Sequence, residues 1–484
     1  MPMILDSSSS SSNASQDEKE ERRRLHHDAE VVIVGAGIVG CALAVALGKQ
    51  GRSVILLERW MKQPDRIVGE LLQPGGVAAL ERLGLRDCLD GIDAIPVQGY
   101  AVIYYGEEVD IKYPLNAGKA DGKRPTGMSF HHGRFVSKLR EAAMLAPNVT
   151  VVESNVLGLI KNEWTGQVLG AECTTRGEKD YYFGQLTVIA DGYASKFRKE
   201  YNPHTPKSRS KFYALELKDA VLPHPQHGHV LLGDNSPVLL YQISTHETRA
   251  LIDVPDNLPS ASRSAGGIEN HLRNLVLPTL PSCVRPSFEE AIVEHPRSMP
   301  NSWLPPSTNK TPGMILLGDA MNMRHPLTGG GMTVGLNDVV LLSELLSPTN
   351  VPQLNDTKTV LKQMKTFHWR RKDITAVINI LAQALYALFA ANGSNLKALQ
   401  LGCFRYFQMG GNCVDGPVGL LAGIIRNPFI LFYHFFAVAF YGIWVKAMQS
   451  NILLLPITLL FGGLSILWTA ICVIGPYIWS EVKS

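Results

Sequence analysis

The chain has 484 residues, too many for one simple core, so we expect two or three domains. Its 46 basic and 43 acidic side chains nearly balance, which argues against a nucleic-acid partner because no basic stripe stands out beyond residues 22–24. The seven cysteines are scattered and form no CxxC pair. This spacing is not that of a disulfide framework, favours a reduced compartment, and gives no sign of a metal site.

The N-terminal segment, residues 1–28, reads MPMILDSSSSSSNASQDEKEERRRLHHD. It is rich in serine and then in charge, so it buries too little apolar surface to offset the entropy lost on ordering, and we predict a disordered tail. The apolar core of a secretory signal peptide is absent from this stretch.

The first periodic segment predicts a dinucleotide cradle. The apolar run EVVIVGAG is typical of a buried parallel strand, and Gly35, Gly37 and Gly40 then form G-x-G-x-x-G at the start of an expected helix. Gly35 allows the tight turn, Gly37 the approach of a pyrophosphate, and Gly40 close helix packing. A second strand ends on Glu58, which is placed to accept a hydrogen bond from a ribose hydroxyl.

Two later stretches favour FAD over a nicotinamide dinucleotide. A buried strand ends in Asp191-Gly192, and another, Met314 to Leu317, leads into Gly318-Asp319. The loop that follows contains three consecutive glycines, 329–331, before a helix expected from about Met332. The carboxylate can bind a sugar hydroxyl, and the glycines let the backbone lie against a planar ring, with the helix N-terminus pointing at it.

Several long motifs carry a family resemblance. The stretches PDRIVGELLQPGG, FHHGRF, LGDAMNMRHPLTGGGMTVGLNDVVLL and GGNCVDGPVGLL resemble the squalene epoxidase family in its fungal form, within the flavoprotein monooxygenase class. The resemblance runs from about residue 29 to the C-terminus. It implies an α/β fold with a Rossmann-like FAD-binding domain, an inserted mixed β-sheet substrate domain, and a C-terminal helical membrane-anchoring region.

The resemblance also implies the site residues. Tyr113 is expected beside the flavin as an active-site positioning residue, with Gln73 as its hydrogen-bond partner. Arg134 is expected to reach the polar edge of the flavin or the pyrophosphate, and Val156 to touch the adenine through its backbone. The FAD contacts implied are Gly35, Gly37, Ile38, Val39, Gly40, Glu58, Arg59, Arg66, Arg134, Val156, Asp319 and Met332.

The implied reaction is the epoxidation of squalene to (S)-2,3-oxidosqualene with O2, through a flavin C4a-hydroperoxide, in ergosterol biosynthesis. NADPH supplies the electrons through a partner, NADPH-cytochrome P450 reductase. This chemistry requires no general base but does require a dry, apolar pocket. We expect residues 237–254 to form two strands that wall this pocket, and His325 to fix the glycine-rich loop as a hydrogen-bond donor.

Two uncharged apolar stretches lie near the C-terminal end of the sequence. No charged residue occurs between Arg426 and Lys446, or between Lys446 and Glu481. Both stretches are long enough to cross a bilayer, although two spanning helices and a hairpin in one leaflet are hard to separate; we favour the hairpin. The family suggests the cytosolic face of the endoplasmic reticulum membrane, and lipid droplets.

The expected organisation is discontinuous. It comprises the tail, 1–28; an FAD domain, 29–100, 128–200 and 310–345; a substrate domain, 101–127 and 205–308; a helical cap, 350–425; and membrane-embedded helices, 427–480. Three alternatives stay open at this stage: a membrane-associated FAD hydroxylase acting on a ring, a flavin-binding scaffold without turnover, and a reductase of prenyl double bonds.

Overall fold

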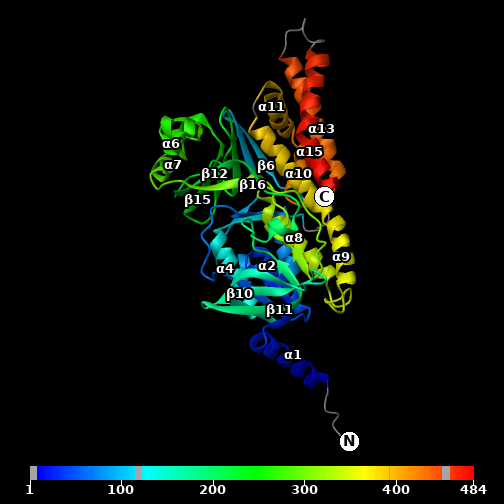
Figure 1. Ribbon diagram of the computed structural model, residues 1–484. Coiled ribbons are helices and arrows are strands. Elements are labelled where there is room, and N and C mark those ends of the chain that lie inside the picture. Colours follow the sequence, from blue (N-terminus) through cyan, green and yellow to red (C-terminus); the bar gives the residue numbers. More distant parts are fainter. Residues whose placement is uncertain (1–7, 116–121, 392, 450–457, 484) are drawn as a thin grey trace.

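The computed structural model describes residues 8–115, 122–391, 393–449 and 458–483. Parts of the expected tail (1–7), substrate domain (116–121), helical cap (392) and membrane helices (450–457) therefore lie outside the described residues. Two large sheets lie one above the other, and a bundle of C-terminal helices runs along one side of both (Figure 1).

The first sheet is built on the cradle strands. The strand order is β8-β2-β1-β11-β10-β9. In addition, β17 pairs with the C-terminal end of β11. Five strands run parallel: β1 (Asp28–Val34), β2 (Val54–Glu58), β8 (Val149–Glu153), β11 (Glu178–Ile189) and β17 (Met314–Leu316). The apolar residues of β1, β2 and β17 are buried, as is typical of parallel strands covered on both faces. The antiparallel pair β9 (Asn155–Lys161) and β10 (Val168–Thr175) completes it. Three helices pack close to this sheet: α2 (Ile38–Lys49), α4 (His132–Leu145) and α8 (Gly330–Leu345).

The second sheet is mixed, with the order β16-β12-β15-β14-β13-β5-β6. Only β5 and β13 pair in parallel. Residues 237–254 form the two expected strands, β14 and β15, which pair antiparallel. The bounds are β5 (Gly99–Tyr104), β6 (Glu107–Lys112), β12 (Lys207–Lys218), β13 (His227–Leu232), β14 (Val238–Gln242), β15 (Glu247–Pro255) and β16 (Arg297–Trp303).

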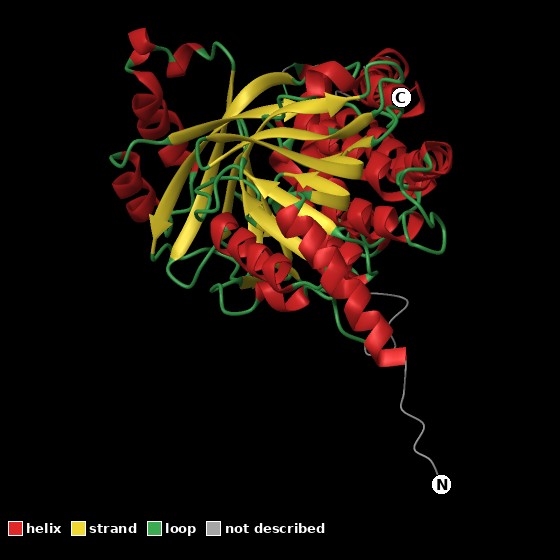
Figure 2. Ribbon diagram, turned by 60° about the horizontal axis from the view of Figure 1, so that its bottom comes forward, coloured by secondary structure: helices red, strands yellow, loops and turns green. Residues whose placement is uncertain are grey.

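The two faces of this sheet have different partners. One face packs on α6 (Gly267–His271) and α7 (Arg285–Ile292), and the opposite face contributes to a core shared with the C-terminal helices. A small sheet of β3 (Leu71–Leu72), β4 (Ile95–Val97) and β7 (Gly127–Ser129) connects the layers, next to α3 (Pro74–Leu83). The short helix α5 (Arg198–Tyr201) follows β11. Figure 2 shows the strands enclosed by helices on both sides.

The C-terminal part is helical. It comprises α9 (Thr357–Arg370), α10 (Lys372–Phe389), α11 (Ser394–Gln408), α12 (Asn412–Leu421), α13 (Pro428–Met448) and α15 (Gly463–Lys483). Among the described residues, three helices are long and apolar enough to cross a membrane: α10, α13 and the helical stretch from Leu459 that includes α15. The last two leave large apolar side chains exposed along their length, including Phe429, Trp444 and Trp468.

The N-terminal segment differs from the expected disordered tail. Residues Ser8–Leu25 form a helix, α1, which projects from the far end of the first sheet (Figure 1). Glutamate, lysine and arginine have good helix propensity, and Arg24 pairs with Glu20 one turn away. Arg23 is also buried and donates to Thr150 in β8, at 3.0 Å. Composition alone misses this tertiary contact.

Candidate active site

One large cavity lies between the two sheets. Its lower wall is the first turn of α2 with Gly37, Ile38 and Val39, and the loop from Gly318 to Met332 closes one side. The second sheet supplies an apolar wall, made by side chains such as Val230, Leu239, Leu251 and Met299. The cavity therefore joins a glycine-rich cradle to an apolar chamber without an intervening layer of protein.

The glycines of the cradle divide into two kinds. A Cβ on Gly35 would lie 2.6 Å from the Ala190 carbonyl oxygen, and one on Gly40 only 1.9 Å from the Gly35 oxygen. These two positions exclude side chains because the backbone itself fills the space. A Cβ on Gly37 meets no atom within 4 Å. Gly37 thus leaves open space above the N-terminus of α2, as a bound pyrophosphate requires, and the residues present fit a dinucleotide.

Glu58 lies at the carboxyl end of β2, beside the cradle. Its Oε2 accepts a hydrogen bond from the Ala36 N–H at 2.8 Å, and its Oε1 accepts one from the Trp60 N–H. Arg140, from α4, forms an ion pair with Glu58 at 3.4 Å and donates to the Ala36 carbonyl at 2.9 Å. The buried Arg140 therefore fixes both the acid and the loop, a role that no local motif indicates.

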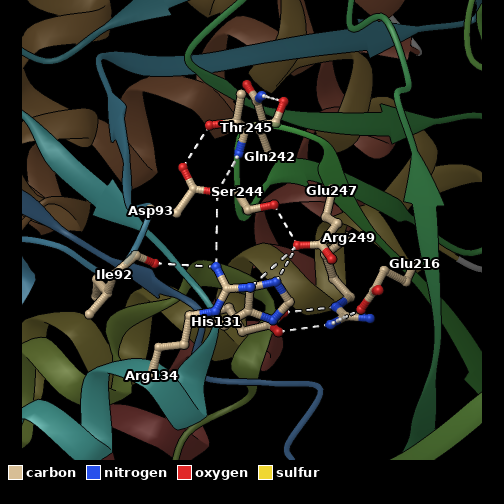
Figure 3. Close-up of polar contacts among 11 residues, drawn as sticks. Ile92, Asp93, His131, Arg134, Glu216, Gln242, Ser244, Thr245, Glu247 and Arg249 are labelled. Atoms are coloured by element: carbon tan, nitrogen blue, oxygen red, sulfur yellow. Dashed lines mark hydrogen bonds and ion pairs between the residues drawn. The ribbon is translucent and has the colours of Figure 1, made fainter.

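The position of Arg134 differs from the sequence-based expectation that it reaches the flavin or the pyrophosphate. It does not line the cavity; its guanidinium donates to the Ile92 carbonyl and lies 3.9 Å from both Asp93 and Glu247 (Figure 3). The expectation failed because α4 begins at His132, so the first-turn arginine faces the loop before β4. Six residues later, Arg140 lies on the face toward the cradle.

The other expected cofactor contacts fall into two groups. Ile38, Val39, Arg66, Asp319 and Met332 line the cavity, and the Arg66 guanidinium lies 4.8 Å from the centre of the Tyr193 ring. Arg59 is exposed and Val156 is buried in β9, and neither lines the cavity. The Val156 carbonyl accepts a hydrogen bond from the Lys196 ammonium.

Arg198 ties the two later stretches together. It donates to the backbone carbonyls of Gly192 and Asp319, both at 3.0 Å, and to that of Ala320 at 3.1 Å. Gly192 and Asp319 both border the cavity. One buried guanidinium thus sets the spacing between two loops that are far apart in sequence, and this residue was not predicted.

Tyr113 and Gln73 make the contact expected of them. The fully buried Tyr113 hydroxyl donates to Gln73 Oε1 at 2.8 Å, and Gln73 Nε2 donates to the Thr328 carbonyl at 2.8 Å and to the Tyr100 hydroxyl. Both the oxygen and the nitrogen of the Gln73 amide therefore have hydrogen-bond partners. The chain of contacts runs from the second sheet to the glycine-rich loop.

Burial keeps the phenols of this wall neutral. It raises the pKa of Tyr100 to about 12 and that of Tyr113 well above its ordinary value, the latter with a further contribution from Tyr100. Because a phenol with such a pKa stays protonated near neutral pH, Tyr113 acts as a hydrogen-bond donor and not as a base.

An ion pair lies buried in the cavity wall. Arg249, in β15, donates two hydrogen bonds to the two oxygens of Glu70, both at 2.9 Å. It donates a third to Glu216 (Figure 3). Burial lowers the pKa of Arg249, but the Glu70 carboxylate outweighs it and raises the value overall. The Tyr241 hydroxyl also donates to Glu70, at 3.3 Å. The pair joins the second sheet to the loop that carries Gln73.

His325 fixes its loop, but not as the donor that was expected. Its Nδ1 accepts a hydrogen bond from the Leu327 N–H at 3.2 Å, and its ring stacks on Tyr386 at 3.8 Å between centroids. Burial lowers the pKa of His325 to about 3, so the ring is neutral and can accept. The donor role was wrong because the loop offers it a backbone N–H.

A polar network lies behind the glycine-rich loop. Arg324 is buried, lines the cavity and donates to the Gly331 carbonyl at 3.3 Å and to Asn322 at 2.9 Å. Asn379, in α10, donates to the same Asn322 oxygen. Arg371 forms a buried ion pair with Asp338, which borders the cavity from α8. The C-terminal helices therefore support the loop directly.

Comparisons with known proteins agree with this architecture. A family model described as squalene epoxidase matches residues 183–460. Squalene epoxidase erg1 of Aspergillus fumigatus is 60% identical over 455 residues, covering 94% of each chain. Squalene epoxidase ERG1 of Gibberella zeae is 54% identical over 481 residues, covering 94% of this chain and 96% of that one. The chain belongs to the squalene epoxidase family.

Solved structures share the fold at lower identity. The p-nitrophenol 4-monooxygenase PnpA from Pseudomonas putida DLL-E4 is similar with a TM-score of 0.67 and 19% identity, over 83% of this chain and 99% of that one. PqsL from Pseudomonas aeruginosa, described as a probable FAD-dependent monooxygenase, has a TM-score of 0.60 and 19% identity, over 75% and 97%. The chain thus shares its fold with these monooxygenase structures, and the expected fold class is confirmed.

Proposed function

We propose that this protein epoxidises squalene to (S)-2,3-oxidosqualene, with FAD as cofactor and O2 as oxidant, as a step of ergosterol biosynthesis. The observation that carries the proposal is the continuous cavity, in which the dinucleotide cradle opens directly onto an apolar wall of the second sheet. A hydrocarbon offers no hydrogen bond for recognition, so shape and exclusion of water must position it.

Different residues of the chain would have different roles in this reaction. Gly37 and the N-terminus of α2 would hold the pyrophosphate, and Asp319 a sugar hydroxyl. Bound FAD, once reduced, supplies the activation of O2. Val230, Leu239 and Leu251 orient the substrate and keep the chamber dry. Tyr113, through Gln73, holds the loop at Thr328 that forms one side of the chamber.

The proposal also covers the source of the electrons and the location of the enzyme in the cell. NADPH is the reductant through NADPH-cytochrome P450 reductase, and the enzyme works at the cytosolic face of the endoplasmic reticulum membrane or on lipid droplets. Support for membrane attachment comes from α13 and α15, with their exposed apolar side chains. Such an attachment would place the apolar chamber near the bilayer in which squalene dissolves.

The test uses the full chain, purified in detergent, with squalene, FAD, NADPH and the reductase. We expect 2,3-oxidosqualene to form only when the reductase is present, and to be lost in Asp319→Ala. A matched control is Asp234→Ala, since that carboxylate lies in the loop between β13 and β14 and is 77% exposed. If FAD binds and NADPH is oxidised without the reductase and no epoxide forms, the ring-hydroxylase alternative replaces this proposal.

A further inference from the structure

A second, smaller cavity also borders α8, and Asp338 lines both cavities. It is bounded by α3, α8, the start of α10 and the segment that precedes α13. Four arginines line it: Arg82, Arg370, Arg371 and Arg426. The proposed reaction does not use this cavity, so it does not explain why four guanidinium groups gather there.

One buried asparagine organises two of these arginines. Asn337 Oδ1 accepts a hydrogen bond from Arg82 Nη2 at 2.5 Å and from Arg426 Nη2 at 3.1 Å. The Asn337 amide nitrogen donates to two backbone carbonyls, of Gly75 at 3.2 Å and Thr333 at 2.8 Å. Its orientation is therefore set by α3 and α8, and the oxygen is held facing both guanidinium groups.

Arg82 and Arg426 are both exposed residues. Among the described residues, no carboxylate forms an ion pair with Arg82 or Arg426, whereas Arg370 pairs with Glu344 and Arg371 with Asp338. The remaining acid of the lining, Asp373, acts on Arg370. Two like charges converge on one neutral oxygen, an arrangement that an anion between them would stabilise.

The position of Arg426 indicates where such an anion comes from. It lies two residues before Pro428, the first residue of α13, and the apolar side chains Phe429 and Tyr433 are 79% and 68% exposed directly after it. Basic residues at the end of an apolar helix lie at the level of lipid headgroups, where anionic lipids present phosphate. The forked geometry of arginine suits phosphate oxygens.

We infer that Arg82 and Arg426, held by Asn337, form a binding site for a phosphate group, carried by an anionic membrane lipid. Inorganic phosphate has the same chemistry, and the experiment separates the two sources. The full chain with FAD is purified in a neutral detergent and mixed with dioleoylphosphatidylserine or dioleoylphosphatidylcholine. Native mass spectrometry counts the retained lipid, and calorimetry with sodium phosphate measures the soluble anion.

We expect at least fivefold greater retention of phosphatidylserine than of phosphatidylcholine, and loss of this preference in Arg82→Gln/Arg426→Gln. The control Arg86→Gln/Arg263→Gln removes the same charge from surface positions outside the cavity and should keep the preference. Arginine-dependent binding of sodium phosphate without a lipid preference would keep the site but assign it to a soluble anion. Identical behaviour of the wild type and the cavity variant toward both ligands would overturn the inference.

A second variant guards against a folding defect. Arg82→Lys/Arg426→Lys keeps both charges but loses the forked contacts, so the phosphatidylserine preference should fall to an intermediate level at unchanged thermal stability. If the lysine variant matches the glutamine variant although both unfold at the wild-type temperature, the forked contacts are essential. If the lysine variant instead binds as the wild type does while the glutamine variant is unfolded, charge alone attracts the lipid, and a built site is refuted.

Discussion

One amide nitrogen of Asn379 donates to two acceptors, Asn322 Oδ1 at 3.1 Å and Glu481 Oε1 at 2.7 Å. The first acceptor belongs to the loop that borders the large cavity, and the second to α15, one of the apolar C-terminal helices. The seating of α15 on α10 is thereby linked to the glycine-rich loop through one side chain.

Glu481→Ala should weaken this link. The buried carboxylate also lies near Arg324 and Arg371, so its removal leaves donors and positive charge without an acceptor, at a cost of about 2–3 kcal/mol. We expect a lower unfolding temperature and severalfold weaker FAD binding, measured by flavin fluorescence. Val482→Ala is the control, since that side chain is 63% exposed. Wild-type FAD affinity in Glu481→Ala would show that the loop does not depend on α15.

Tyr113→Phe tests the contact between the second sheet and the loop. It deletes the hydroxyl that donates to Gln73 and leaves a buried oxygen without that donor, which costs about 1–2 kcal/mol. We expect kcat to fall about tenfold with little change in FAD affinity, because the loop at Thr328 loses its support. Tyr105→Phe, at a 51% exposed position, should behave as wild type. Unchanged kcat would reduce Tyr113 to a packing role.

Two alanine substitutions in the cradle should separate folding from cofactor binding. Gly40→Ala places a Cβ 1.9 Å from the Gly35 oxygen, so it should destabilise the protein even without FAD. Gly37→Ala meets no protein atom within 4 Å, and its φ of −85° suits alanine. It should fold normally but bind FAD at least tenfold more weakly. Normal FAD binding in Gly37→Ala would place the pyrophosphate elsewhere.

Arg134 and Arg140 make a matched pair on one helix. Arg140→Ala removes the buried partner of Glu58 and of the Ala36 carbonyl, at a cost of about 2–3 kcal/mol, and should release FAD. Arg134→Ala removes contacts outside the cavity and should leave FAD binding within twofold of wild type. Equilibrium titration of the flavin measures both. The reverse ranking would restore the sequence-based assignment.

The stability of the protein should fall in mild acid. Burial and the neighbouring Arg66 lower the pKa of His132 to about 4, so the unfolded chain binds a proton below pH 6.5 that the folded chain excludes. This one residue should cost about 1 kcal/mol of unfolding free energy between pH 6.5 and 5.5. His132→Gln, which keeps a donor for the Gly69 carbonyl, should flatten the decline in chemical denaturation. An equally steep decline in that variant would assign it to other groups.

The fold and the cradle were predictable because their signals are local. A buried strand, a G-x-G-x-x-G turn and the acid of the next strand occur in one short segment, and the structure builds β1, α2 and β2 from it. The two apolar runs of residues 237–254, separated by a polar turn, likewise predicted β14 and β15. Periodicity is a property of neighbouring residues, so the sequence shows it directly.

The supporting arginines were not predictable, because their partners are distant in the chain. Arg198 contacts carbonyls near Asp319, Arg140 those near Ala36, and Arg249 the carboxylate of Glu70. A carbonyl acceptor leaves no mark on the sequence, and any residue provides one. The assignment of Arg134 failed for the same reason. Its guanidinium belongs to a recognised motif, but its partners depend on which way that face of α4 points, and the sequence does not show this.

The buried network around Asn322 has a consequence for the order of folding. Arg324 and Arg371 are synthesised well before Glu481, so a nascent chain can form the cradle while these guanidinium groups still lack the last carboxylate. Arg371 can already pair with Asp338, so until α15 docks water has to take only the place of Glu481, and this part of the cavity wall stays wet. Docking of α15 would then be the event that dries the wall, so the interior that faces the cavity would be completed only after the last described helix is synthesised.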